Sequence, residues 1–158
     1  MLFQWLSLRL TEEEIQYAGK LWSIPENSLA LRCKFREELM AIHTWMLADM
    51  LQTMFPDEEE FHAMLGAVLS QIYEHLANAT DVDYGTWGLS LTAKWNGYSA
   101  AMPSTHQQGP LWVLAKHIDS NLFGERRFDF QAQHAMVTYI GVTMKHLGKT
   151  LAKYGIRE

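Results

Sequence analysis

The sequence predicts an all-α protein, a single-domain bundle of about six helices that spans residues 1–158. Apolar residues recur every three or four positions in several long segments, as on the buried face of a helix. Capping residues, glycines and prolines divide these segments, and no segment shows the alternation typical of a β-strand. With 48% hydrophobic residues, a chain of 158 residues is long enough to bury one core.

The first two predicted helices have clear sequence boundaries. Thr11 and Glu14 match a capping box, with Leu10 and Ile15 placed as a hydrophobic staple, so a helix is expected to run to about Trp22. A longer helix is expected from near Ser28 to just before Pro56. Its predicted buried face consists of Phe35, Leu39, Ile42, Met46, Met50 and Met54.

Four more helices are predicted in the remainder of the chain. Asp57 and Glu60 cap the third helix, and residues 78–86 are expected to form a loop after it. The fourth helix contains residues 91–102 and ends before Pro103, the fifth runs from Pro110 to Gly124, and the sixth runs from about Asp129 to Gly155. The apolar stripe of the third helix is Phe61, Met64, Leu65, Val68, Leu69, Ile72 and Leu76. Those of the last two are Leu111, Leu114, Ile118 and Leu122, then Val137, Ile140, Met144, Leu147 and Leu151.

Gly97 lies in the interior of the fourth predicted helix, where glycine is about 1 kcal/mol less favourable than alanine. Ala93, Gly97 and Ala101 form a stripe of small residues on this helix. We expect this stripe to let another helix backbone approach closely, while Trp95 and Tyr98 fill the core.

Composition limits the possible functions. The single cysteine, Cys33, excludes an internal disulfide and fits a reducing compartment, and residues 1–10 lack the features of a secretory or mitochondrial import signal. The net charge of −5 argues against a dedicated nucleic-acid binder. Charge is unevenly distributed: residues 1–60 carry 5 basic and 11 acidic side chains, whereas residues 125–158 carry 6 basic and 3 acidic ones.

The sequence predicts neither a metal site nor a catalytic centre. Glu59 and His62 form one Glu-x-x-His pair, but a di-iron site in a helical bundle needs two pairs and further carboxylates. His134 and His146 lie about 120° apart around one helix. Cys33 has basic neighbours but no histidine nearby in sequence, and no phosphate-binding loop is present. We therefore predict no enzyme activity, no metal and no cofactor.

Three segments, in order, resemble the ubiquinol–cytochrome c chaperone family. The stretch "ELMAIHTWMLADML" is similar to that family's Leu-His-x-Trp-Leu element, and "HIDSNLFG" to its Ala-Arg-Asn-Leu-Phe-Gly. Between them, the helix around Gly97 is similar to a Phe-Tyr-Gly-Arg helix that continues into Ala-Tyr-x-Ala-Ala-Leu. The matching positions include Ile42, His43, Trp45, Met46, Ala93, Lys94, Tyr98, Asn121, Leu122, Phe123 and Gly124. The chain looks like a divergent member over residues 20–154.

This resemblance implies a non-enzymatic assembly factor for a respiratory cytochrome bc complex. Such a protein would bind newly made cytochrome b or a small partner protein, on the matrix side of the mitochondrial inner membrane or in a bacterial cytoplasm. The resemblance implies partner-binding roles for His43, Trp45, Lys94, Tyr98, Asn121 and Phe123. Two alternatives are a metal- or haem-binding helical protein, supported only by seven histidines and nine methionines, and a helical subunit of a larger assembly.

The last predicted helix carries a basic stripe. Lys145, Lys149, Lys153 and Arg157 are spaced by four residues, and no acidic residue stands among them. The stripe can be a solvated face that favours the helix C-terminus. Alternatively, it can be a docking strip for an acidic partner, ribosomal RNA or an anionic membrane surface, without sequence-specific recognition of nucleic acid.

Overall fold

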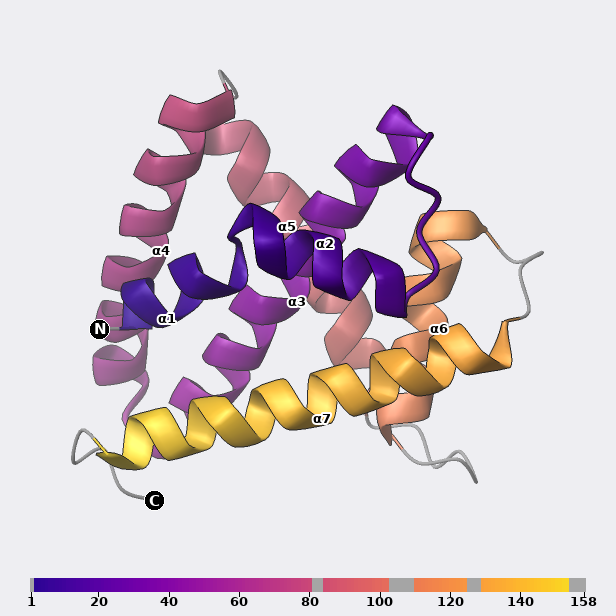
Figure 1. Cartoon of the computed structure of the whole chain (residues 1–158). Coiled ribbons are helices and arrows are strands. Elements are labelled where there is room, and N and C mark those ends of the chain that lie inside the picture. Colours follow the sequence, from indigo (N-terminus) through magenta and orange to yellow (C-terminus); the bar gives the residue numbers. More distant parts are fainter. Residues whose placement is uncertain (1, 81–83, 103–109, 125–128, 154–158) are drawn as a thin grey trace.

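A computed structural model describes residues 2–80, 84–102, 110–124 and 129–153, and it confirms the all-α prediction. Within these residues the chain forms a bundle of seven helices and no strands (Figure 1). The helices are α1 (Leu2–Arg9), α2 (Glu12–Leu21), α3 (Leu29–Met54), α4 (Glu58–Thr80), α5 (Tyr84–Ala101), α6 (Pro110–Phe123) and α7 (Phe130–Lys153).

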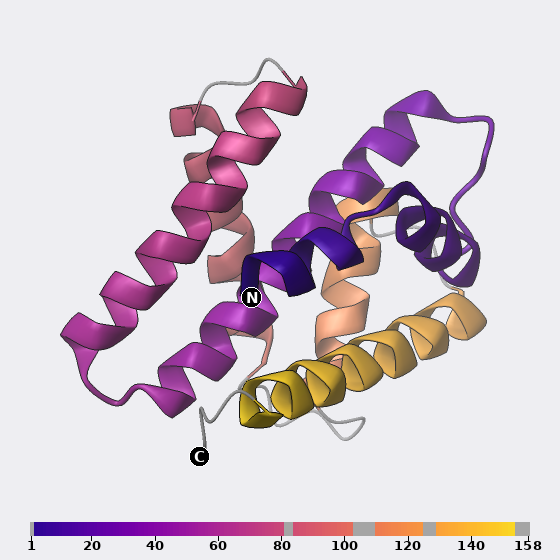
Figure 2. The same ribbon diagram turned by 60° about the vertical axis from the view of Figure 1, so that its left-hand side comes forward.

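Helix α3 is the centre of the bundle and packs against each of the other six helices. α4 and α5 lie on one side of it and α6 and α7 on the other, and α5 also packs against α6 (Figure 2). All residues from 38 to 48 are buried. The predicted single buried face was therefore too narrow, because a helix surrounded by neighbours is buried on every side. Met50 and Met54 at its C-terminal end are only partly buried.

The predicted helix starts are confirmed by their caps. Thr11 Oγ1 accepts the Glu14 N–H at 3.3 Å, and Ser28 Oγ accepts the Leu31 N–H at 3.4 Å. Asp57 Oδ1 accepts the Glu60 N–H at 2.9 Å. Each side-chain oxygen satisfies an N–H that has no partner in the first helical turn. After the C-terminal end of α6, Gly124 adopts a φ of 74°, a left-handed conformation that glycine adopts without strain.

One helix was missed by the sequence analysis, and one predicted loop was wrong. α1 was not predicted, yet it brings the buried side chains of Trp5 and Leu6 into the core. Much of the predicted loop at 78–86 is helical, because α4 continues to Thr80 and α5 begins at Tyr84. Local turn propensity is a weak preference that the surrounding structure can override. Residues 81–83, Pro103 and Gly155 lie outside the described residues.

Helices α1 and α2 lie across α3, and α2 also packs on α7 (Figure 1). This arrangement places side chains from both ends of the chain beside the middle of α3. Among the described residues, no helix combines the length and apolar character required to span a membrane.

Candidate functional site

Three of the residues implied by the resemblance meet at one buried carboxylate. Glu38 of α3 is only 1% exposed. Its carboxylate accepts hydrogen bonds from Lys94 Nζ, from Tyr98 OH at 2.5 Å and from Asn121 Nδ2 at 3.0 Å. Lys94 and Tyr98 lie on α5 and Asn121 on α6, so this Glu38 cluster joins three helices. Glu38 itself was not predicted as a site residue.

Both carboxylate oxygens of Glu38 accept hydrogen bonds within the cluster. Lys94 bonds to Oε2, whereas Tyr98 and Asn121 bond to Oε1, so both carboxylate oxygens have donors. Burial raises the pKa of Tyr98, and the charge and hydrogen bond of Glu38 raise it further. The phenol therefore keeps its proton, and the arrangement fits a structural cross-link better than acid–base catalysis.

The aromatic residues beside this cluster are also engaged inside the protein. The Trp45 ring lies edge-on to Tyr98 with centroids 5.9 Å apart, and its Nε1 donates to Ser99 Oγ at 3.1 Å. Phe123 is partly buried and packs against the core. A partner on the surface does not reach Trp45 or Tyr98, so any effect of these residues on partner binding acts through the shape of the bundle.

His43 belongs to a second group, which we call the His43 cluster: the buried His43 and Tyr139 and the partly buried Glu14. His43 Nδ1 donates to the Leu39 carbonyl at 2.6 Å, which leaves Nε2 as an acceptor in the neutral ring. Tyr139 OH lies 3.1 Å from this Nε2 and 3.0 Å from Glu14 Oε1. One hydroxyl hydrogen therefore faces two acceptors. Desolvation lowers the pKa of His43 to about 4, so the ring is neutral at pH 7.

The His43 cluster continues to the protein surface. Glu14 forms an ion pair with Arg9 at 3.2 Å, and Arg9 also donates to His146 Nδ1 at 3.4 Å. These contacts tie α1, α2 and α7 together at the edge of a groove of about 290 Å³. The groove is lined by Arg9, Glu14, Tyr17, Leu21, Ala135, Thr138, Tyr139, Val142, Thr143 and His146.

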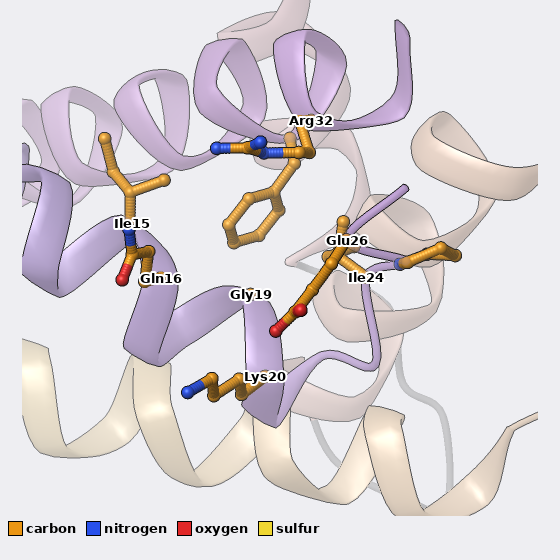
Figure 3. A pocket seen from close by; sticks show the side chains of 9 residues that line it. Ile15, Gln16, Gly19, Lys20, Ile24, Glu26 and Arg32 are labelled. Atoms are coloured by element: carbon orange, nitrogen blue, oxygen red, sulfur yellow. The ribbon is translucent and has the colours of Figure 1, made fainter. Parts of the chain in front are cut away.

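A second hollow, of about 350 Å³, lies between α2 and the start of α3 (Figure 3). Its lining includes the buried residues Gly19 and Phe35 and the exposed side chains of Lys20, Glu26 and Arg32. Arg32 is paired with the exposed Glu12 at 3.6 Å. Among the described residues, none of the buried polar atoms that lack a hydrogen-bond partner lines this hollow. It therefore offers space and a polar rim.

The lysines of the predicted basic stripe are exposed on α7. Lys145, Lys149 and Lys153 all face solvent, and within the described residues none of them forms an ion pair or a hydrogen bond through its side chain. Arg157, the fourth residue of the stripe, lies outside the described residues. We call Lys145, Lys149 and Lys153 the lysine row.

Gly97 is a contact point between helices, but its partner differs from the expected one. A Cβ built on Gly97 would lie 2.6 Å from Nε2 of His117, which extends from α6. The glycine therefore makes room for an imidazole ring and not for a helix backbone. Ala93 is exposed, so the predicted stripe of small residues does not form one interface.

The described residues contain no group of three or more histidine, cysteine, aspartate or glutamate side chains placed to hold a metal ion. His62 is exposed and lies 3.6 Å from Glu58, on the same helix. Cys33 is exposed. The absence of a bound metal, a cofactor and an enzyme activity stays a prediction.

Comparison with known proteins finds no relative. No family model, no curated protein and no solved structure matches the chain. The resemblance to the ubiquinol–cytochrome c chaperone family therefore depends on the sequence segments alone, and membership of that family stays a prediction.

Proposed function

We propose that this protein is a non-enzymatic assembly factor for a respiratory cytochrome bc complex. In this role it binds newly made cytochrome b or a small partner protein. The observation that best supports a binding function is the lysine row, because it presents three exposed charges without a described intramolecular partner. The choice of client is supported by the family-like segments of α3, α5 and α6.

The interior supports binding more than catalysis. Glu38 and Tyr98 are buried and bond to each other, and the 23% exposed side chain of Lys94 is bonded to Glu38. A catalytic acid or base has to reach its substrate within hydrogen-bonding distance, directly or through one water. The outer surface is therefore the better place for function, and α7 offers the described lysine row.

In this proposal the family-like residues form the scaffold that holds α7 in place. Lys94, Tyr98 and Asn121 fix α5 and α6 to α3 through Glu38, and α6 in turn packs along α7. The site of action is the matrix side of the mitochondrial inner membrane in a eukaryote, or the cytoplasm in a bacterium. A permanent helical subunit would use the same surface but would not leave the mature complex.

The proposal is tested by replacing the lysine row with glutamine and purifying the protein from its native source. We expect the Lys145→Gln/Lys149→Gln/Lys153→Gln variant to stay folded, because the three side chains are exposed. It should recover several-fold less cytochrome b or assembly partner at low salt, since a contact between exposed charges is screened by salt. A Lys20→Gln/Lys34→Gln variant, which changes two other exposed lysines, is the control.

Recovery of the mature bc complex, and not of its newly made components, would favour a permanent subunit. If the parent protein recovers no component of a cytochrome bc complex under gentle conditions, the proposed function is wrong.

A further inference from the structure

The residues on the outer face of α7 change along the helix, from Ala135 and Val142 in its first half to lysines in its second half. Ala135, Val142 and Lys149 are spaced by seven residues, which places each about 20° from the previous one around the helix. Lys145 and Lys153 flank this line within about 60° of Val142. In the first half of the face, Ala135 and Val142 border the groove together with the exposed Thr138, and the second half is the lysine row.

Helix α2 forms the second wall of the groove beside the first half of α7. Tyr17 and Leu21 of α2 line it opposite Ala135 and Val142 of α7. Tyr17 is 57% exposed and Val142 is 51% exposed, so both walls present apolar surface to solvent. A shared groove with apolar residues on both walls differs from single exposed apolar residues, which are normal on a protein surface.

Four polar groups at the groove are bonded to each other. Glu14 is held by Arg9 and Tyr139, and Arg9 also reaches His146. The groove therefore offers its apolar walls for contact, and the unpaired charge lies beyond it, on the lysine row. An occupant that fits both parts has an apolar face for the groove and acidic residues where it meets the lysine row.

We propose that this face docks an acidic amphipathic helix of a partner protein. Its apolar side lies between Tyr17 and Val142, and its carboxylates meet Lys145, Lys149 and Lys153. The distance along α7 from Val142 to Lys153 is about 16 Å, or three turns of a helix. Laying an apolar helix face in a groove is a common mode of peptide recognition. This inference rests on the proposed function for the identity of the partner.

The groove favours a protein helix over the other polyanions that attract lysines. A membrane surface is broad and does not enter a groove between two helices. Single-stranded nucleic acid binds through several aromatic rings along a basic track, whereas this groove contributes the exposed ring of Tyr17 and the buried ring of Tyr139. Charge complementarity therefore selects an acidic segment, and the apolar walls select a helix.

The test uses a fluorescent helical peptide of about 15 residues with leucines along one face and three glutamates near one end. Fluorescence anisotropy measures its binding to the full chain. We expect Val142→Glu to weaken binding by about tenfold or more, as for loss of a central apolar contact. The glutamine variant of the lysine row should weaken binding at low salt and reduce its salt dependence.

Two controls are matched to these changes. Leu89→Glu replaces another exposed apolar residue, 77% exposed on α5, and should leave binding unchanged. A peptide with its glutamates changed to glutamine should bind the parent protein as weakly as the glutamate peptide binds the lysine-row variant. Circular dichroism and thermal unfolding verify that each variant is folded.

Several results would overturn the proposal. One is no peptide binding, or binding that Val142→Glu does not change. Another is tighter binding to phosphatidylglycerol vesicles or to poly(U) RNA that depends on the lysines and not on Val142. A third is self-association of the parent chain that Val142→Glu abolishes, because the occupant would then be a second copy.

The purification test separates this inference from the proposed function. If Val142→Glu recovers cytochrome b normally and the lysine-row variant does not, the proposed function stands and the groove has no role. If the peptide binds as expected but no bc-complex component is recovered, the docking surface stands and the proposed function is wrong.

Discussion

The two polar clusters of this protein differ in the number of hydrogen-bond donors that their acceptors have. In the Glu38 cluster, three donors on two other helices meet one carboxylate. In the His43 cluster, the single hydroxyl hydrogen of Tyr139 faces both Glu14 and His43. A buried network in which every acceptor has a donor favours one arrangement of its helices. In a network with more acceptors than donor hydrogens, adding a proton changes the hydrogen bonds. The first cluster therefore sets the fold, and the second is where acid should act.

The clusters also differ in what they hold in place. The Glu38 cluster joins α3, α5 and α6 in the interior. The His43 cluster joins α2, α3 and α7, and through Arg9 and His146 it borders the groove at the surface. The Glu38 cluster is thus part of the scaffold, and the His43 cluster lies next to the proposed docking face.

Replacing Glu38 should have the largest effect on stability. Glu38→Ala leaves Lys94 and Tyr98 without their buried acceptor, and breaking a buried charged pair in this way costs about 3–5 kcal/mol. Urea unfolding at pH 7 measures the loss. Glu37→Ala, at the exposed neighbouring position, is the control and should change the free energy of unfolding by less than about 0.5 kcal/mol. Equal effects of the two variants would show that the Glu38 cluster does not stabilise the fold.

Acid should destabilise the protein through His43. Its pKa falls from 6.5 in the unfolded chain to about 4 in the folded one, so the unfolded state binds more protons between these values. Stability is therefore retained above pH 6.5 and decreases as pH falls towards 4, by on the order of 3 kcal/mol. His43→Gln should remove this part of the pH dependence. His62→Gln, a change at an exposed histidine, should keep it, and identical curves for all three proteins would contradict the role of His43.

Enlarging Gly97 should have a smaller effect, because it disturbs one contact between α5 and α6. Gly97→Leu should cost about 1–3 kcal/mol by forcing the His117 ring aside, and Gly97→Ala should cost less. Gly66→Leu is the control, since nothing lies within 4 Å of a Cβ at that glycine. Removing the His117 ring should relieve the clash, so the Gly97→Leu/His117→Ala double variant should regain much of the stability that Gly97→Leu loses. An unchanged melting temperature for Gly97→Leu would show that the contact is absent.

Most of the fold could be predicted because the helix ends are local features. Thr11, Ser28 and Asp57 cap helices through contacts only three residues away, and such spacing is visible in a sequence. α1 is only 8 residues long, so its helical state depends on the burial of Trp5 and Leu6. That burial depends on neighbours distant in sequence.

The candidate site was harder to predict, because its contacts join residues far apart in the chain. Glu38 could have been noticed, since it lies about 40° from Ile42 around the helix, at the edge of the predicted apolar face of α3. An acidic residue in such a position needs a buried partner. Which partners it has could not be read from the sequence, because Lys94 and Asn121 are 56 and 83 residues away. The same holds for Tyr139, which meets His43 across 96 residues.

The most direct test of a scaffold with a separate docking face is site-specific photo-crosslinking in cells of the native source. A photoreactive residue replaces Val142 or Lys149 on the docking face, and Leu89 or Glu37 elsewhere on the surface as controls. We predict crosslinks from positions 142 and 149 to an acidic helical segment of a cytochrome bc complex component, and none from the controls. Crosslinks to such a component from position 89 or 37 alone would contradict the account.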